Sequence, residues 1–92
     1  MLKVFKYEVG LYTTVVSLPV GAKVLHFDFQ HDKPHIWVLV DPDALTELRE
    51  FLFTGTGHEI NLPMSQLRFI GTTLRNEPFV WHLFEILPEV TK

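Results

Sequence analysis

The sequence predicts an all-β domain, a small antiparallel β-sandwich or a partly open barrel of about seven strands. A chain of 92 residues has room for one domain, here residues 1–92. Aromatic residues make up 13% of the chain and stand in short apolar segments, which is typical of strands. Gly, Pro, Asn and Asp separate these segments and favour turns. One short helix near residues 43–52 is the alternative that the pattern leaves open.

Composition excludes several classes of protein. Hydrophobic residues make up 47% of the chain, enough to build a folded core. Eight Lys and Arg stand against eleven Asp and Glu, so the net charge of -3 lacks the basic character of most nucleic-acid-binding proteins. Without Cys the chain has no disulfides, no thiolate zinc site and no thiol nucleophile. Residues 1–10 mix charges with apolar residues, unlike a signal peptide, and no apolar run reaches the roughly 20 residues that span a bilayer. We therefore expect a soluble, cytoplasmic domain that binds neither nucleic acid nor membrane.

The first part of the chain predicts two strands. Residues 2–9 alternate between apolar and charged side chains, and Gly10 ends the alternation. Residues 12–18 are rich in β-branched side chains and end at Pro19. Both patterns are typical of short strands.

The clearest unit is a β-hairpin over residues 23–40. Apolar side chains share one parity before the break and one parity after it. A turn at residues 31–32 pairs Phe27 with Ile36, and a turn one residue later pairs Phe27 with Val38. Both registers keep the apolar side chains on one face, so the sequence predicts the hairpin whichever turn forms.

Residues 41–54 fit either a helix or a strand. Residues 41–43, Asp-Pro-Asp, are a good helix start, and the apolar residues after them fall on one helical stripe. Residues 47–54 can also run as a strand that Gly55 ends. The local pattern slightly favours the helix.

Two more strands are predicted, over residues 66–72 and 79–87. The last segment, FVWHLFEIL, has seven apolar residues among nine, on both parities, so both of its faces need cover. A sandwich interior or a partner subunit would supply that cover. We expect a symmetric dimer through this strand or through the face that carries Trp37.

A glycine-rich tetrapeptide is the best local binding motif: Gly55, Thr56, Gly57 and His58. Two glycines permit positive φ and expose backbone N–H groups, which can hold a phosphate or carboxylate. Arg49, Arg68 and Arg75 would add positive charge to such a site. The motif matches neither common phosphate-loop pattern, and a plain tight loop is the alternative.

Trp37 is the second candidate, as a partner-binding residue. It shares a hairpin face with His26, Asp28, Gln30 and His35, and an aromatic side chain on a mixed polar face is typical of an interface anchor. A place in the sandwich core is the alternative.

The histidines and serines give no sign of catalysis. His31 and His35 have the spacing of metal ligands on a helix but not across a hairpin, so we expect no metal site and no cofactor. His26 and His82 lie in the middle of strands, where half-buried, hydrogen-bonded side chains are expected. The two serines lack the setting of a nucleophile elbow, and we expect no catalytic residue.

Several segments together resemble a family of short uncharacterised proteins from phages, prophages and bacteria. They are FKYEV, LPVGAKVLHFDFQ with KPHIWVLVDPDA, TE-LR-F with GTGH, FIGT and FVWHLFE. The resemblance covers nearly the whole chain but implies no activity. It implies a strand, not a helix, over residues 47–54. Relatives tend to carry Asn-Gly in the hairpin turn, where this chain has His31-Asp32, so a type I′ turn is not implied here.

Three functions follow from these observations. The first is a non-catalytic accessory protein of phage type that binds a host protein in the host cytoplasm, such as an inhibitor of host defence. The alternative is a module that binds or sequesters a small nucleotide-like anion. The second alternative is a metal-assisted hydrolase that uses His31, His35 and His58. We expect the first.

Overall fold

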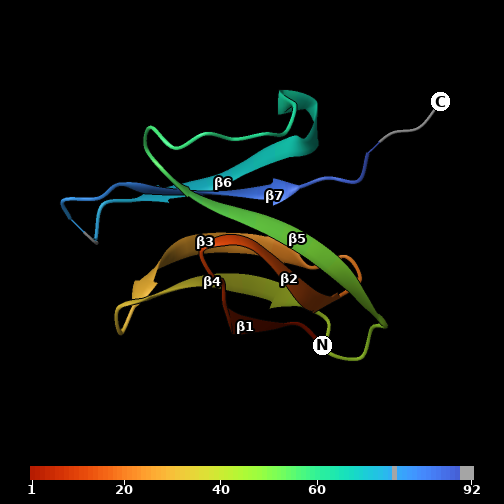
Figure 1. Cartoon of the computed structure of the whole chain (residues 1–92). Coiled ribbons are helices and arrows are strands. Elements are labelled where there is room, and N and C mark those ends of the chain that lie inside the picture. The colour runs from red at the N-terminus through yellow and green to blue at the C-terminus, as the bar shows by residue number, and fades with distance from the viewer. Residues whose placement is uncertain (76, 90–92) are drawn as a thin grey trace.

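Seven strands in two antiparallel sheets make up a sandwich-like fold in the computed structural model, which describes residues 1–75 and 77–89 (Figure 1). No closed barrel forms from these residues. The all-β prediction is therefore confirmed. The strands are β1 (Lys3–Glu8), β2 (Tyr12–Pro19), β3 (Lys23–Gln30), β4 (Lys33–Val40), β5 (Thr46–Gly55), β6 (Leu67–Thr73) and β7 (Trp81–Ile86), and a turn of 3₁₀ helix, η1 (Met64–Gln66), precedes β6.

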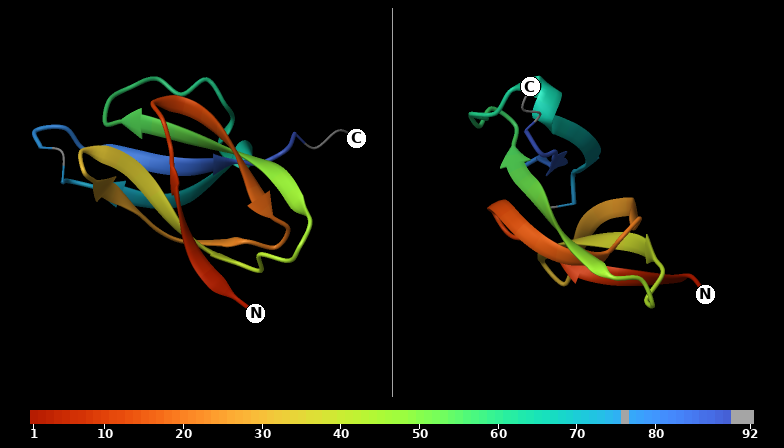
Figure 2. Two further views of the ribbon diagram at one scale, coloured as in Figure 1. Left: turned by 90° about the horizontal axis from the view of Figure 1, so that it is seen from below. Right: turned by 90° about the vertical axis from the view of Figure 1, so that its right-hand side faces the viewer.

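The three-stranded sheet has the order β1-β4-β3, and the four-stranded sheet has the order β2-β5-β7-β6. The long strand β5 runs across the molecule and joins β2 to β7 and β6 (Figure 2). Because β7 lies between β5 and β6, the chain from β5 to η1 must cross over β7. It does so on the outer face of the four-stranded sheet (Figure 1).

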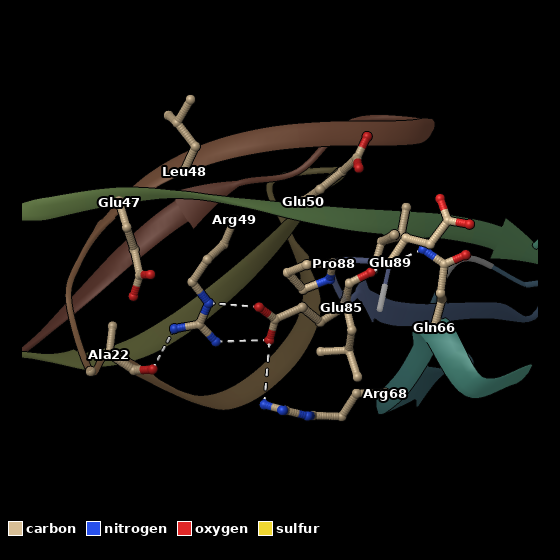
Figure 3. A pocket seen from close by; sticks show the side chains of 13 residues that line it. Ala22, Glu47, Leu48, Arg49, Glu50, Gln66, Arg68, Glu85, Pro88 and Glu89 are labelled. Carbon is tan, nitrogen blue, oxygen red and sulfur yellow. Dashed lines mark hydrogen bonds and ion pairs between the residues drawn. The ribbon is translucent and has the colours of Figure 1, made fainter. Parts of the chain in front are cut away.

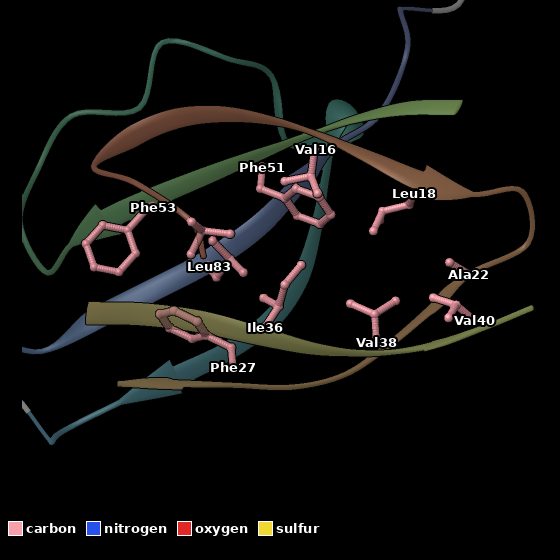
Figure 4. Close-up of a cluster of buried hydrophobic side chains, with 11 residues drawn as sticks. Val16, Leu18, Ala22, Phe27, Ile36, Val38, Val40, Phe51, Phe53 and Leu83 are labelled. Atoms are coloured by element: carbon pink, nitrogen blue, oxygen red, sulfur yellow. The ribbon is translucent and has the colours of Figure 1, made fainter. Parts of the chain in front are cut away.

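The core lies between the two sheets, where alternate residues of each strand point inward (Figure 4). In β4, the side chains of Ile36, Val38 and Val40 are fully buried, as strand alternation with one covered face requires. Phe27 meets Phe53 of the opposite sheet edge to face, with ring centroids 5.8 Å apart. Burial of each large apolar side chain stabilises the fold by about 1.5–3 kcal/mol. The buried core residues are Val9, Val16, Leu18, Ala22, Phe27, Ile36, Val38, Val40, Phe51, Phe53 and Leu83.

The β3–β4 hairpin takes the first of the two predicted registers, with Phe27 opposite Ile36. Its turn residues His31 and Asp32 have φ of 53° and 63°. Positive φ at both central residues is the mark of a type I′ turn, whose twist matches that of the flanking strands. The type I′ turn, which the resemblance did not imply for this chain, is therefore present. His and Asp tolerate this conformation better than most residues do.

A β-bulge interrupts β3. The register against β4 shifts between Val24 and His26, which leaves Leu25 out of the ladder and exposed. By parity Leu25 would share the inward face of Phe27. The bulge turns it outward, because an extra residue reverses the direction of the side chains that precede it.

The possible helix near residues 43–52 is wrong, because Thr46–Gly55 is a ten-residue strand. Hydrogen bonds to β2 on one edge and to β7 on the other fix it in extended form. Phe51 and Phe53 are buried between the sheets, and Leu52 is buried on the outer face. Tertiary pairing outweighs the weak local preference for a helix.

Both apolar faces of strand β7 are at least partly covered by the chain itself. Leu83 points into the core, while Phe84 and Ile86 on the outer face are half-buried. Ile60 and Leu62 of the crossing segment line a hollow together with Ile86, so the chain itself supplies much of the cover. Both edges of β7 are already paired, which leaves no edge through which this strand could pair with a second copy.

The turn conformation predicts a stabilising substitution. Changing His31-Asp32 to Asn-Gly (H31N/D32G) should raise the free energy of unfolding by about 0.5–1 kcal/mol, because Asn and Gly adopt positive φ with less strain. This corresponds to a rise in Tm of several degrees, about 4–8 °C per kcal/mol. Thermal unfolding followed by circular dichroism measures it. Asp43→Gly, in a turn without positive φ, is the control and should lower Tm; a double variant no more stable than wild type would contradict the turn assignment.

Candidate functional site

Aromatic and ionic side chains gather at opposite ends of the sandwich. The β1–β2 and β3–β4 turns, the end of β5 and the start of β7 lie at one end, because the antiparallel registers place them together. We call this the aromatic end; its residues are Leu11, Tyr12, Phe29, Phe53, His58, Phe79 and Trp81. The opposite end holds a cleft that we call the ionic cleft; its charged residues are Glu47, Arg49, Glu50, Arg68, Glu85 and Glu89.

A series of aromatic rings in contact with one another extends from the core to the surface at the aromatic end. Phe27 meets Phe53 as described, and Phe53 stacks on Trp81 with centroids 4.8 Å apart and planes at 19°. Trp81 in turn contacts Phe79 at 6.1 Å. Exposure rises along this series from 3% at Phe27 to 60% at Phe79. The core therefore holds the surface rings in place.

Trp81 also carries a polar atom without a partner. Its indole Nε1 is buried and makes no hydrogen bond to any residue that the structure describes. A buried Trp N–H ordinarily has an acceptor, because leaving it unpaired costs free energy.

Two hollows flank the Trp81 ring. One of about 280 Å³ is lined by His58 and Phe79, and the other, of about 330 Å³, by Leu11 and Phe29. The aromatic end thus has an apolar surface with two depressions.

The Gly55–His58 loop forms one wall of this surface. The Gly55 N–H donates to Nδ1 of His58 at 3.2 Å, and the His58 ring lies edge-on to Trp81 with centroids 5.8 Å apart. A Cβ on Gly55 would come within 2.8 Å of the His58 ring, so close packing requires glycine there. Gly57 has φ of +87°, so the turn conformation requires the second glycine.

The loop is not an open cradle for an anion. Besides the Gly55 N–H, the Thr56 N–H donates to the Val80 carbonyl and the His58 N–H to the Gly55 carbonyl, both at 3.1 Å. Three of the four N–H groups are thus used inside the protein. The tight-loop alternative describes the geometry better than the anion site does.

Arg49 and Arg68 do not lie at this loop, so the structure does not bring together the residues of the site predicted from the sequence. Arg49 lies six residues before Gly55 on β5, about 20 Å away along the strand. Both arginines reach into the ionic cleft, a hollow of about 530 Å³ (Figure 3). Arg75 lies elsewhere again, where its Nε is 2.8 Å from Asp28.

Arg49 makes a largely buried, bidentate ion pair with Glu85. Its Nε and Nη2 donate to the two carboxylate oxygens at 2.7 and 2.8 Å, and its Nη1 donates to the Ala22 carbonyl (Figure 3). The hydrogen bonds to Glu85 raise the pKa of Arg49. Arg68 approaches the same carboxylate at 3.8 Å. Four Glu line the cleft against two Arg, and both Arg already face Glu85, so no positive charge is left over for an anion.

Asp28 is a structural link between the sheets that the sequence did not predict. Its carboxylate accepts hydrogen bonds from the Thr73 hydroxyl at 2.6 Å and from the Phe29 N–H at 2.8 Å, and it pairs with Arg75. Burial alone would raise the pKa of Asp28, but these hydrogen bonds and the charge of Arg75 outweigh it, so the pKa is lowered. Thr73 belongs to β6 and Asp28 to β3, so the contact joins the edges of the two sheets.

Trp37 lies on the outer face of the three-stranded sheet, so its possible place in the core is wrong. The rings of His26 and His35 flank it at 5.8 and 6.1 Å. The imidazole of His26 is exposed and 3.6 Å from Asp28, contrary to the half-buried position expected for it. His82 is half-buried as predicted, between the hydroxyls of Thr56 and Thr72 at 2.7 and 2.8 Å.

The remaining sequence-based sites concern metals and membranes. Over residues 1–75 and 77–89, no three His, Asp or Glu side chains lie close enough to share a metal ion, and His31, His35 and His58 are not brought together. The same residues contain no helix with the length and apolarity to cross a membrane.

The fold and this surface define a small all-β, sandwich-like domain with an apolar, aromatic surface at one end. Within that class, the chain belongs to the family described as a domain of unknown function (DUF7352), whose model matches residues 1–91. The expected membership of an uncharacterised family is thereby confirmed. No curated protein and no solved structure matches the chain.

The buried ion pair predicts a characteristic pattern of stability. Arg49→Met or Glu85→Leu alone should lower the free energy of unfolding by about 3–5 kcal/mol, because each leaves a buried charge without its partner. The double variant should recover most of that loss. Urea unfolding measures all three, with Arg68→Met as a control of little effect, since Arg68 is exposed and 3.8 Å from the carboxylate. A double variant as unstable as the sum of the single variants would show that the two residues act independently.

The lowered pKa of Asp28 predicts an acid-sensitive contribution to stability. Since the folded-state pKa lies below the unfolded value of about 3.9, ionised Asp28 stabilises the fold above that pH. The contribution is lost as the pH falls through the folded-state pKa. Asp28→Asn should therefore be less stable than wild type at pH 7, and the difference should shrink in strong acid. Urea unfolding at both pH values tests this; Asp43→Asn removes a surface carboxylate, and its difference from wild type should not change in the same way.

Proposed function

We propose that this protein is a non-catalytic binding protein that recognises a partner protein through its aromatic end. The observation that carries the proposal is the series of aromatic rings in contact from Phe27 through Phe53 and Trp81 to Phe79. Aromatic anchors held by a core lose little conformational entropy on binding, which is why such residues dominate protein interfaces.

The exposed residues of the aromatic end support the same proposal. Leu11, Tyr12 and Phe79 all expose most of their surface around the two hollows beside Trp81. Tyr12 has φ of 65°, an unfavourable conformation for a tyrosine, and it holds the side chain out at the start of β2. Strained residues of this kind concentrate at binding sites.

The partner proposed here presents an apolar side chain. That side chain would enter a hollow beside Trp81. The resemblance to phage and bacterial proteins extends the proposal to an accessory protein that acts in the host cytoplasm. The partner would then be a host protein, and inhibition of a host defence would be the natural effect.

The anion-binding alternative gains no support from the geometry. That alternative combined the N–H groups of the Gly55–His58 loop with Arg49 and Arg68. Three of the loop N–H groups already form hydrogen bonds within the protein, and both arginines face Glu85. The metal-assisted hydrolase likewise has no group of ligands among the described residues.

The first experiment locates the binding surface. A photo-crosslinking amino acid is placed at Phe79 or, as the control, at Leu45, which is 85% exposed at the opposite end. In a host lysate, a partner protein should be captured from position 79 and not from position 45. Equal capture from both positions would contradict the proposal.

The second experiment measures the contribution of the anchors with the purified partner. Phe79→Ala and Leu11→Ala should each raise the Kd about tenfold or more, because each removes an exposed anchor of the aromatic end. Leu45→Ala should bind as wild type does. Titration calorimetry gives the three Kd values, and circular dichroism confirms that each variant is folded. Wild-type affinity in both anchor variants would place the interface elsewhere.

A further inference from the structure

Strand β2 is the edge strand of the four-stranded sheet and pairs only with β5 among the described strands. It has eight residues, and its register against β5 has no irregularity. Its sequence, YTTVVSLP, contains no charged residue, and neither does the longer stretch from Val9 to Ala22. A regular, uncharged, β-branched edge is a ready template for another strand.

The other three edge strands carry the usual protection against such pairing. Strand β1 has Lys3, Lys6 and Glu8. Strands β3 and β6 are each interrupted by a bulge, and the Asp28–Thr73 contact holds these two edges together. Charges and bulges are the devices by which sheets avoid edge-to-edge association. Among the edge strands that the structure describes, β2 alone has neither.

The direction of the backbone groups on β2 follows from one hydrogen bond. The Val20 N–H donates to the Leu45 carbonyl at 2.7 Å, just beyond the end of the strand. Since backbone groups alternate along a strand, the even-numbered residues of β2 face β5. The N–H and C=O groups of Thr13, Val15 and Ser17 therefore face outward. Pro19, which has no N–H, also falls on the free side, where proline is tolerated.

We propose that β2 pairs with β2 of a second copy of this chain, antiparallel, about a twofold axis at Val15. Thr13 then lies opposite Ser17 of the second copy, and the two Val15 residues lie opposite each other. The three pairs exchange about six backbone hydrogen bonds. Thr with Ser and Val with Val are favourable cross-strand pairs. The result is a continuous eight-stranded sheet made from two chains.

This proposal is independent of the proposed function. The outer-face side chains of Thr13, Val15 and Ser17 are all exposed. Pairing uses the free edge of β2 and leaves Phe79 and the ring series untouched. Failure of the aromatic end to bind a partner protein would not affect it, and the reverse also holds.

Solution mass tests the proposal directly. Sedimentation equilibrium of the full chain at about 100 µM should give twice the chain mass of 10.7 kDa. Val15→Lys places two like charges opposite each other and should raise the dimer Kd about 100-fold. Val4→Lys is the matched control: Val4 is 53% exposed on edge strand β1, against 57% for Val15, and this variant should remain dimeric.

A cysteine variant keeps the test decisive even if Val15→Lys unfolds. The chain has no Cys, so Val15→Cys introduces a single thiol close to the twofold axis. Opposed residues of an antiparallel pair have the Cα separation that a disulfide needs. Under mild oxidation, Val15→Cys should give a covalent dimer and Val4→Cys should not. A wild-type mass of 10.7 kDa at this concentration, or equal crosslinking from both positions, would overturn the proposal.

Discussion

The pairing of Arg49 with Glu85 constrains how two neighbouring strands of the four-stranded sheet align, because Arg49 belongs to β5 and Glu85 to β7. Both side chains point between the sheets, and Nε and Nη2 of Arg49 each donate a hydrogen bond to the Glu85 carboxylate. Because either charge left alone would be costly, the pair fixes the register in which Phe51 of β5 lies opposite Glu85 of β7. Nη1 of the same guanidinium donates to the carbonyl of Ala22, so Arg49 also holds the turn between β2 and β3. The contact thus joins β5, β7 and the β2–β3 turn at one end of the core.

The ionic contact at one end explains why the other end can be almost wholly aromatic. Charged groups at the ionic cleft satisfy one another, and the rings of Phe53 and Trp81 continue the core toward the opposite surface. An aromatic surface supported in this way is rigid, since each ring is packed against the next. The two ends thus differ in chemistry: charged groups pair at the ionic cleft, and exposed apolar side chains gather at the aromatic end.

The sequence predicted what depends on local alternation and missed what depends on distant partners. The hairpin and the register of Phe27 with Ile36 followed from parity alone. The strand at residues 46–55 did not, because its extended form requires β2 and β7, and only the family resemblance favoured it. For the site, Gly55–His58 was found through its glycines, whereas Phe79 and Trp81 were counted only as residues in need of cover. Arg49 and Arg68 were misplaced because sequence spacing carries no information about Glu85, 36 residues away from Arg49. The opposite signs of charge at residues 49 and 85, which share the parity of the buried residues in their strands, are a signal that could have indicated the pair.

The order of the strands in the four-stranded sheet also determines the order in which the chain can fold. The β3–β4 hairpin is local and can form as soon as Val40 has been synthesised, whereas β2 finds its partner only when β5 is complete at Gly55. At a synthesis rate of about 5–20 residues per second, β2 remains without any neighbour for a few seconds. Throughout that interval, an uncharged stretch from Val9 to Ala22 is free on both edges. The nascent chain is thus most prone to association through β2 before β5 emerges and pairs with it.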